Sequence, residues 1–138
     1  MFIDINGLDE QAELEADICV VGAGPAGISM ARDFIGTSVR VLLVESGDIE
    51  FDGDTQELYA SDSVGVPYFA LDQSRLRYFG GSSNHWDNWC GEFAPIDFRR
   101  RPWVPDSGWP FGIEELLPYY DRARPLCGLP PRRSTEWI

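Results

Sequence analysis

Lysine is absent from this 138-residue sequence, and histidine occurs once, as His85. All eleven basic residues are arginines, and the 23 acidic residues outnumber them, which gives a formal net charge of −12. Such a charge repels phosphate backbones, so we expect no nucleic-acid partner. One histidine and dispersed cysteines provide no ligand spacing for a metal ion, so we predict no metal site.

Cysteine is also scarce. Cys19, Cys90 and Cys127 lie far apart in the sequence, form no C-x-x-C motif and are odd in number, so they do not indicate a disulfide framework. This pattern favours a reducing compartment, and we expect a cytoplasmic location. Because no basic residue stands beside Cys90 in NWCGEF, a packed cysteine is favoured there over a reactive thiol.

Long apolar runs are missing as well. No segment approaches the roughly 18 consecutive apolar residues that a membrane-spanning helix needs, so we expect no membrane partner. The N-terminal MFIDINGLDEQAELEAD is acidic and lacks an apolar core, which is not the pattern of a signal peptide. We interpret residues 1–16 as a polar lead-in.

Residues 17–47, in contrast, have the pattern of a β-α-β unit. DICVV (17–21) and VRVLLV (39–44) are short, apolar and rich in β-branched residues, as buried parallel strands are. Between them, residues 25–36 predict a helix that begins at a proline, carries an apolar face and ends at Gly36. The predicted fold class is therefore α/β, with a Rossmann-like unit built on a parallel pair of strands.

GAGPAG, residues 22–27, joins the first strand to this helix and is typical of dinucleotide binding. Gly22 permits the turn, Gly24 lets a diphosphate approach the backbone, and Gly27 lets the helix pack closely on the strand. The helix N-terminus then presents N–H groups to the diphosphate. Glu45, at the end of the second strand, is placed to accept hydrogen bonds from the adenosine ribose and would repel a 2′-phosphate. The motif alone leaves both FAD and NAD open.

The rest of the chain is less regular. Residues 48–74 show no clear period, and residues 75–112 are rich in Gly, Pro and Trp, which predicts a loop-rich segment. A short helix is expected from Ile113. Pro118 interrupts it, so residues 119–123 continue as a kinked or second helix.

Two segments of this region carry a family resemblance. RLRYFGGSSNHW, from Arg75, and GEFAPIDFRRRPWVPDSGWPFGIEELLPYY, from Gly91, resemble the glucose-methanol-choline (GMC) oxidoreductases, in particular the bacterial branch related to pyranose oxidase. The resemblance implies FAD as the cofactor. In that family an arginine-containing strand runs into G-G-x-S, which crosses the cofactor near its diphosphate and isoalloxazine. Carried over to this chain, residues 80–83 line that part of FAD.

The same resemblance gives His85 a specific role. In some members of the family, the histidine of G-G-x-S-x-H is bonded covalently to the flavin 8α-methyl group, and His85 falls at that place. Two alternatives stay open. Either His85 lies near the flavin without a bond, or it is a loop residue packed between Trp86 and Trp89.

The resemblance further implies oxidation of an alcohol CH–OH group, in a sugar, glycoside or polyol, by hydride transfer to FAD. The family's catalytic base is a histidine, paired with a second histidine or an asparagine, late in the sequence. We therefore expect the catalytic residues beyond residue 138 and no turnover by this chain alone. Residues 17–138 are then a partial FAD-binding domain, with a second flavin-binding loop region at 75–112.

Two other interpretations remain open: a non-catalytic FAD-binding subunit that is completed by a second chain or by homo-oligomerisation, and an NAD-binding module. Under the FAD interpretation, the predicted cofactor-binding residues come from the first turn, the end of the second strand and the later glycine-rich loop. They are Gly22, Gly24, Pro25, Ala26, Gly27, Glu45, Ser46, Arg77, Gly80, Gly81, Ser82, Ser83, Asn84, His85 and Trp86.

Overall fold

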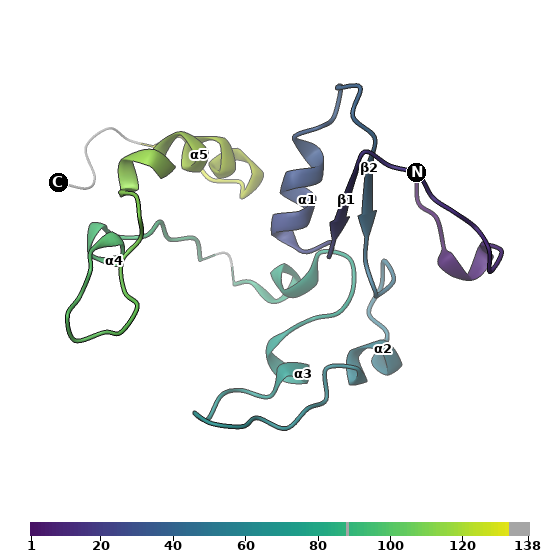
Figure 1. The fold of residues 1–138 in the computed structure, drawn as a ribbon, viewed down its shortest axis with the longest axis horizontal. Helices are drawn as coiled ribbons and strands as arrows, with labels where there is room; N and C mark the ends of the chain where they lie inside the picture. Colours follow the sequence, from purple (N-terminus) through teal and green to yellow (C-terminus); the bar gives the residue numbers. More distant parts are fainter. Residues whose placement is uncertain (88, 133–138) are drawn as a thin grey trace. The chain divides into compact units, whose positions relative to one another are not determined.

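The computed structural model describes residues 1–87 and 89–132 (Figure 1). The chain divides into two compact units, Met1–Asp87 and Asn88–Ile138, which are considered separately below. The last residues of the predicted FAD-binding domain, 133–138, lie outside the described part.

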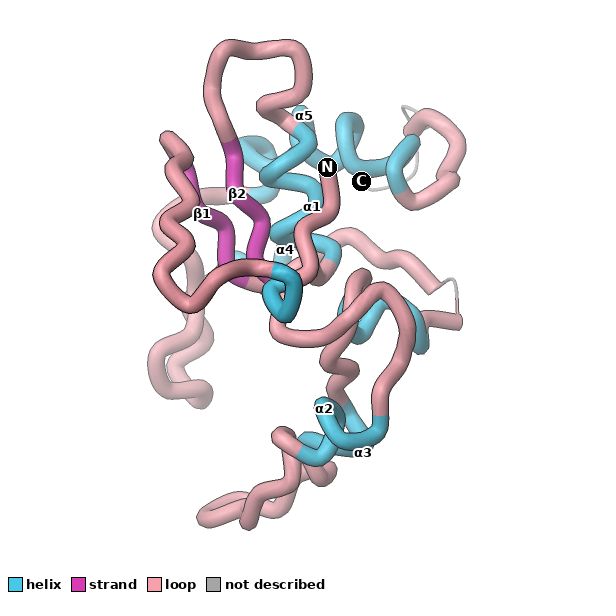
Figure 2. Tube along the Cα trace, turned by 90° about the vertical axis from the view of Figure 1, so that its right-hand side faces the viewer, coloured by secondary structure: helices cyan, strands magenta, loops and turns pink. Residues whose placement is uncertain are grey.

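The first unit is organised around a β-α-β motif. Strand β1 (Ile18–Val21) and strand β2 (Val41–Val44) pair in parallel, with Ile18 opposite Val41 and Val21 opposite Val44. Figure 2 shows the two strands side by side. Helix α1 (Pro25–Arg32) is the crossover between them. The strand-helix-strand order and the parallel pairing predicted from the sequence are thus confirmed as a two-stranded unit.

Helix α1 ends earlier than predicted. The sequence pattern extends the helix to Gly36, but the last helical residue is Arg32. After it, the chain tightens into turns, in which the Phe34 N–H donates to the Ala31 carbonyl and the Ile35 N–H to the Arg32 carbonyl, at 3.3 and 3.1 Å. Such three-residue bonds commonly close a helix end. Phe34 and Ile35, which lie in these turns, line the same groove as Ile28 and Ala31 of the helix. The apolar pattern therefore extends beyond the last helical residue.

Close packing of α1 on β1 fixes the turn between them. Gly22 has a φ of +99°, a left-handed value that strongly favours glycine. A Cβ on Gly27 would collide with the Gly22 carbonyl oxygen and lie 3.3 Å from Val20 Cγ1. Val20 and Ala23 are the buried apolar residues here, at 8% and 1% exposure. The predicted roles of Gly22 and Gly27 are both seen in this geometry.

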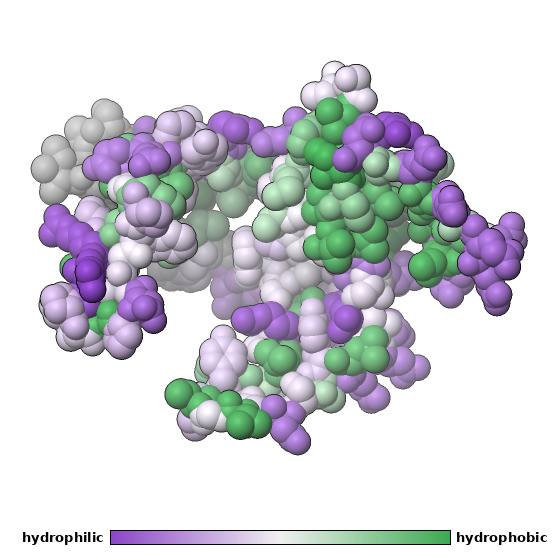
Figure 3. All heavy atoms as spheres, viewed as in Figure 1, coloured by the Kyte–Doolittle hydropathy of each residue, from purple (hydrophilic) through white to green (hydrophobic). Residues whose placement is uncertain are grey.

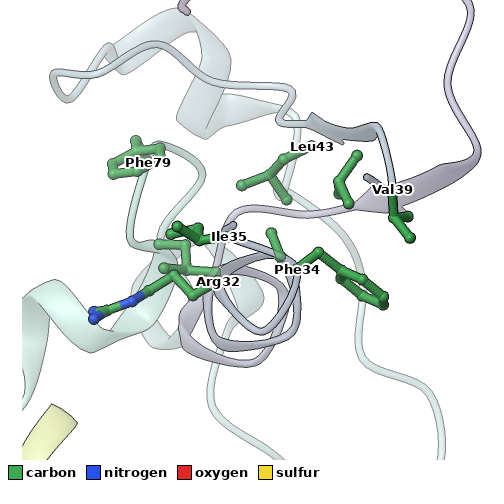
Figure 4. A pocket seen from close by; sticks show the side chains of 9 residues that line it. Arg32, Phe34, Ile35, Val39, Leu43 and Phe79 are labelled. Carbon is green, nitrogen blue, oxygen red and sulfur yellow. The ribbon is translucent and has the colours of Figure 1, made fainter. Parts of the chain in front are cut away.

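The predicted core face of α1 lines an open groove. An open hollow of about 330 Å³ is lined by apolar side chains that include Ile28, Ala31, Phe34, Ile35 and Leu43 (Figure 4). Ile35 is 77% exposed. Apolar side chains gather on the surface above this motif (Figure 3). The remaining lining residues are Arg32, Val39, Val41 and Phe79.

Short elements complete the first unit. The N-terminal segment forms a 3-10 turn, η1 (Ile5–Gly7), and the Phe2 ring packs edge-on against Phe79 at 5.8 Å. The lead-in therefore contributes one aromatic contact, although its composition is polar. The other elements are α2 (Gly53–Glu57), α3 (Leu71–Ser74) and the 3-10 helix η2 (Gly81–His85).

The second unit is built around Phe98. This residue ends helix α4 (Pro95–Phe98) and is 8% exposed, with the rings of Phe93 and Phe111 each 6.1 Å away. Trp109 adds a ring contact to Phe111 at 5.5 Å. The remaining element is helix α5 (Ile113–Leu126). Aromatic contacts therefore replace regular secondary structure as the main packing of this loop-rich segment.

Helix α5 continues through Pro118 and Pro125 as one helix of 14 residues. The sequence pattern left a kink or a second helix open at Pro118, and the structure shows a single element. Proline lacks the N–H that would reach the carbonyl four residues earlier, so the helix loses a bond at each site. Glu92 forms partly buried ion pairs with Arg124, in the helix, and with Arg132, which follows it, at 2.9 and 3.8 Å.

Across residues 1–87 and 89–132, no helix combines the length and the apolar character needed to cross a bilayer.

We predict that Gly27→Ala lowers the free energy of unfolding by about 1–3 kcal/mol, because the added Cβ forces the helix away from the Gly22 carbonyl. Urea denaturation followed by circular dichroism measures the change. Gly53→Ala is the control, since no heavy atom lies within 4 Å of its added Cβ, and it should change stability by less than about 0.5 kcal/mol. Equal stability of the two variants would contradict the packing argument.

Candidate functional site

Two glycine-rich segments that are distant in sequence meet in the first unit. The Gly80 N–H donates to the Ala23 carbonyl at 2.8 Å. A Cβ on Gly81 would lie 3.2 Å from Gly24 Cα, so the two backbones are in direct contact there. Gly80 and Gly81 have φ values of +92° and +55°. The loop can approach the turn this closely because neither partner carries a side chain.

Glu45 binds the backbone of the first turn. It follows β2, and its Oε2 accepts a hydrogen bond from the Ala23 N–H at 2.7 Å. Its Oε1 accepts from the N–H groups of Ser46 and Gly47, at 2.9 and 3.2 Å. Partial burial raises the pKa of the Glu45 carboxyl, but these hydrogen bonds outweigh it and hold the pKa below the ordinary value. The group is therefore a carboxylate at neutral pH.

The predicted role of Glu45 toward a ribose stays a prediction. A carboxylate has about four acceptor positions. Three backbone N–H groups and the Ser46 hydroxyl, at 3.3 Å, already donate to Glu45. A ribose hydroxyl would have to share or displace one of these donors.

A third segment, residues 46–48, contacts the residues that precede the glycine loop. The Arg77 Nε donates to the Ser46 hydroxyl at 2.8 Å, and its guanidinium lies 4.8 Å from the centre of the Tyr59 ring. A Cβ on Gly47 would meet the Arg77 carbonyl, so the backbones of segments 46–48 and 77–79 are in direct contact. The structure thus brings Arg77, Ser46 and Glu45 together, as the predicted set requires.

Gln56 organises this region and was not anticipated from the sequence. It is 8% exposed, and its side-chain amide donates to the carbonyls of Asp72 and Arg75 at 2.6 and 2.7 Å. Its oxygen accepts from the Arg77 N–H at 3.0 Å. The available signal was Asp52, which caps helix α2 by accepting from the Thr55 N–H at 2.7 Å. A capping residue at position 52 predicts that a helix begins there, but it does not predict the hydrogen-bond partners of Gln56.

Side chains after the two glycines shape the loop itself. The Ser82 hydroxyl accepts from the Leu76 N–H at 3.2 Å, and the Ser83 hydroxyl donates to the Gly80 carbonyl at 2.6 Å. The Asn84 amide donates to the carbonyls of Phe79 and Gly81, both at 3.0 Å. The predicted contacts of Ser82, Ser83 and Asn84 with a cofactor stay predictions. In the structure, their hydrogen bonds support the loop in which Gly80 and Gly81 have left-handed φ values.

His85 and Trp86 lie at the end of this loop. His85 is the last residue of η2 and is exposed, and Trp86 is 54% exposed. Trp89 is 92% exposed, so its ring is not packed. This exposure disfavours the interpretation of His85 as a residue packed between two tryptophans. The two cofactor roles of His85 stay predictions.

The N-terminus of α1 offers two amides to a ligand. The Ile28 N–H makes the first helical bond, to the Gly24 carbonyl at 3.0 Å. Pro25 has no N–H, so Ala26 and Gly27 carry the amides that precede this bond and have no acceptor within the helix. These amides and the positive end of the helix dipole favour an anion.

Comparisons with known proteins give distant relatives. No family model matches the chain, and no solved structure matches it significantly. The chain is 25% identical over 142 residues to a 2-methyl-1,2-propanediol dehydrogenase from Mycolicibacterium austroafricanum, with 83% of this chain and 25% of that protein covered. It is 27% identical over 127 residues to a paromamine 6′-oxidase from Streptomyces fradiae, with 81% and 24% covered. The similarity is thus to proteins named as oxidoreductases, and the chain spans about a quarter of their length.

We predict that Glu45→Gln destabilises the first unit in a pH-dependent way. Because the pKa of Glu45 is lower in the folded chain, its contribution is complete above about pH 4.5, its ordinary value, and is lost as the pH falls below it. The variant should therefore be less stable by about 1–2 kcal/mol at pH 7, with a difference that shrinks in acid.

Urea denaturation of both proteins at a series of pH values measures this difference. The pKa values of Asp17 and Asp52 are also lowered by hydrogen bonds, but both residues are present in both proteins and cancel in the comparison. Parallel stability curves from pH 7 into acid would show that the Glu45 carboxylate does not hold the turn.

Proposed function

We propose that this chain is the FAD-binding part of a flavin-dependent oxidoreductase that acts on an alcohol. The observation that carries the proposal is the contact of the Gly80–Gly81 loop with the turn at Ala23 and Gly24. The first segment is typical of dinucleotide binding, the resemblance to the GMC oxidoreductases implies that the second lines the same cofactor, and the two segments meet in one place. A glycine turn that only joined a strand to a helix would not need a second glycine pair against it.

The residues present fit a dinucleotide. No heavy atom lies within 4 Å of a Cβ built on Gly24, which leaves open space beside the turn. The amides of Ala26 and Gly27 favour the diphosphate, and the ionised Glu45 disfavours a 2′-phosphate. Because the chain carries a net charge of −12, an anionic ligand depends on these local backbone dipoles.

The relatives support the class of reaction. One is named for a diol, and the other is named as an oxidase of paromamine. Both names fit oxidation of an alcohol, which is also what the GMC resemblance implies. A bound flavin supplies a hydride acceptor, and this chain contributes binding and orientation of that group. We assign the catalytic base to chain beyond residue 138.

A second candidate is an FAD-binding subunit completed by another polypeptide. The observation that favours it is the open apolar groove on α1 and β2, with Ile35 77% exposed. A two-stranded sheet is marginal alone and gains stability when further strands or helices cover its apolar face. Another chain, or a second copy of this one, would provide that cover.

We predict that the 138-residue chain binds FAD and that Gly24→Ala weakens this binding by about tenfold or more, equal to about 1.4 kcal/mol, by placing a methyl group at the diphosphate. The fold should tolerate the change, because the added Cβ meets no atom. Quenching of flavin fluorescence on titration measures the affinity, with Gly53→Ala as the matched control and NAD as the competing ligand. Binding of NAD without FAD, or equal FAD affinity of all variants, would contradict the proposal.

We further propose His85 as the point of covalent attachment, since it ends the loop that contacts the turn and its side chain is accessible. The expected result is that yellow colour stays with the acid-precipitated protein and that a flavin mass is found on the His85 peptide. His85→Ala should lose the bound colour after acid while keeping reversible FAD binding. Colour that remains wholly in the supernatant of the unsubstituted protein would leave His85 as a non-covalent neighbour.

A further inference from the structure

Residues 75–79 lead into the glycine loop, so their course decides where the Gly80–Gly81 pair lies. At the end of this segment, the Phe79 N–H donates to the Asp48 carbonyl at 2.9 Å. The next residue makes the 2.8 Å bond to the Ala23 carbonyl that joins the loop to the first turn. The start of the segment is anchored by a buried side chain of helix α2.

The Gln56 amide binds the start of this segment as a neighbouring strand would. Its Nε2 donates to the Arg75 carbonyl at 2.7 Å, and its Oε1 accepts from the Arg77 N–H at 3.0 Å. Arg75 is extended, with φ −134° and ψ 148°. A residue of a parallel strand bonds in the same way to the residues on either side of its partner. A single side chain therefore fixes two backbone positions of the segment.

The hydrogen bonds of Gln56 are made within the chain. The second bond from its Nε2 goes to the Asp72 carbonyl at 2.6 Å, so both amide donors are used. The residue is 8% exposed. Burial of a polar side chain is tolerated when its hydrogen bonds are satisfied. Gln56 can therefore influence a ligand through the residues that it holds and not by direct contact.

Arg77, which Gln56 holds, belongs to the predicted cofactor-binding set. Its guanidinium lies 4.8 Å from the centre of the Tyr59 ring, and its Nε donates to the Ser46 hydroxyl at 2.8 Å. The Tyr59 N–H in turn donates to the Gln56 carbonyl at 3.0 Å. The short stretch from Gln56 to Tyr59 thus contacts both the backbone and the side chain of Arg77.

We propose that Gln56 is a positioning residue of the FAD site. It holds residues 75–77 so that Arg77 stays beside Ser46 and the Gly80–Gly81 loop stays against the first turn. This inference rests on the proposed function, because the affinity for FAD is what depends on the position of the loop. The carboxamide is required, since it offers two donors and an acceptor to two carbonyls and one N–H.

Gln56→Glu tests this requirement with almost the same side-chain shape. An ionised carboxylate has no hydrogen to donate to the carbonyls of Asp72 and Arg75, whereas the protonated form regains one donor and keeps an acceptor for Arg77. Burial and the facing carbonyl oxygens favour the protonated form, so it should persist above the ordinary pKa of about 4.3. The variant should therefore bind FAD poorly at neutral pH and recover in acid.

The test measures the FAD affinity of the full 138-residue chain by quenching of flavin fluorescence, relative to the unsubstituted chain at the same pH. Gln56→Met fills the space but makes none of the amide's bonds, so it should bind FAD about tenfold more weakly at every pH. Gln56→Glu should be as weak at about pH 8 and should come within about threefold of the unsubstituted chain at about pH 5.

Asp52→Ala is the matched control, because the Asp52 side chain caps the same helix by accepting from the Thr55 N–H. Its FAD affinity should change by less than about twofold. Circular dichroism of each variant separates positioning from instability. Partial unfolding weakens the apparent affinity only in proportion to the folded fraction, so a folded variant cannot lose about tenfold in this way. If Gln56→Met does not fold, the pH series of Gln56→Glu decides.

The positioning role is overturned if folded Gln56→Met binds FAD as well as the unsubstituted chain, or if Asp52→Ala loses as much affinity. It is also overturned if Gln56→Glu does not recover in acid. Failure of the proposed function gives a different result, since the unsubstituted chain itself would then bind no FAD, and the positioning role would fall with it.

Discussion

The backbone of Ala23 holds the candidate site together. Its N–H donates to Glu45 and its carbonyl accepts from Gly80, so this one residue links the end of β2 to the glycine loop. Ala23 is 1% exposed, and its position depends on the close packing of α1 on β1 at Gly27. A shift of the helix would move both hydrogen-bonding groups at once. The glycine-rich turn is thus fixed by packing, independently of any ligand.

Under the proposed function, this arrangement also explains how an acidic chain could hold an anionic ligand. The Glu45 carboxylate accepts a hydrogen bond from the Ala23 N–H. This bond helps to lower the pKa of the carboxyl group and keeps it ionised beside the turn. The amides of Ala26 and Gly27, three and four residues further along, have no acceptor within the helix and favour an anion. The Glu45 carboxylate and the proposed anion therefore use different amides of the same segment. Under the proposed function, the same charge that stabilises the fold disfavours an extra phosphate on the ribose.

The sequence predicted those features that depend on neighbours in the chain. The two strands, the start of α1 at Pro25 and the position of Glu45 all follow from local patterns, and each is present. The role of Gln56 was missed because it depends on contacts with residues that are 16 to 21 positions away in the chain. The prediction that Cys90 is a packed cysteine was wrong, because the residue is exposed. The glycine loop is an intermediate case. Its residues were predicted from the family resemblance, but its contact with Ala23 is visible only in the folded structure.

The open groove shows why hydrophobic periodicity has a limit as a guide. The pattern of Ile28, Ala31 and Ile35 predicts a helix face that packs, and the face is where the pattern places it. Periodicity specifies which side chains avoid water but not which surface covers them. In the described residues, Leu43 and Phe79 cover this face only in part, and Ile35 remains exposed. A parallel β-α-β unit has apolar strands on both faces because further layers normally pack there. We therefore propose that a further layer packs on the apolar face of α1.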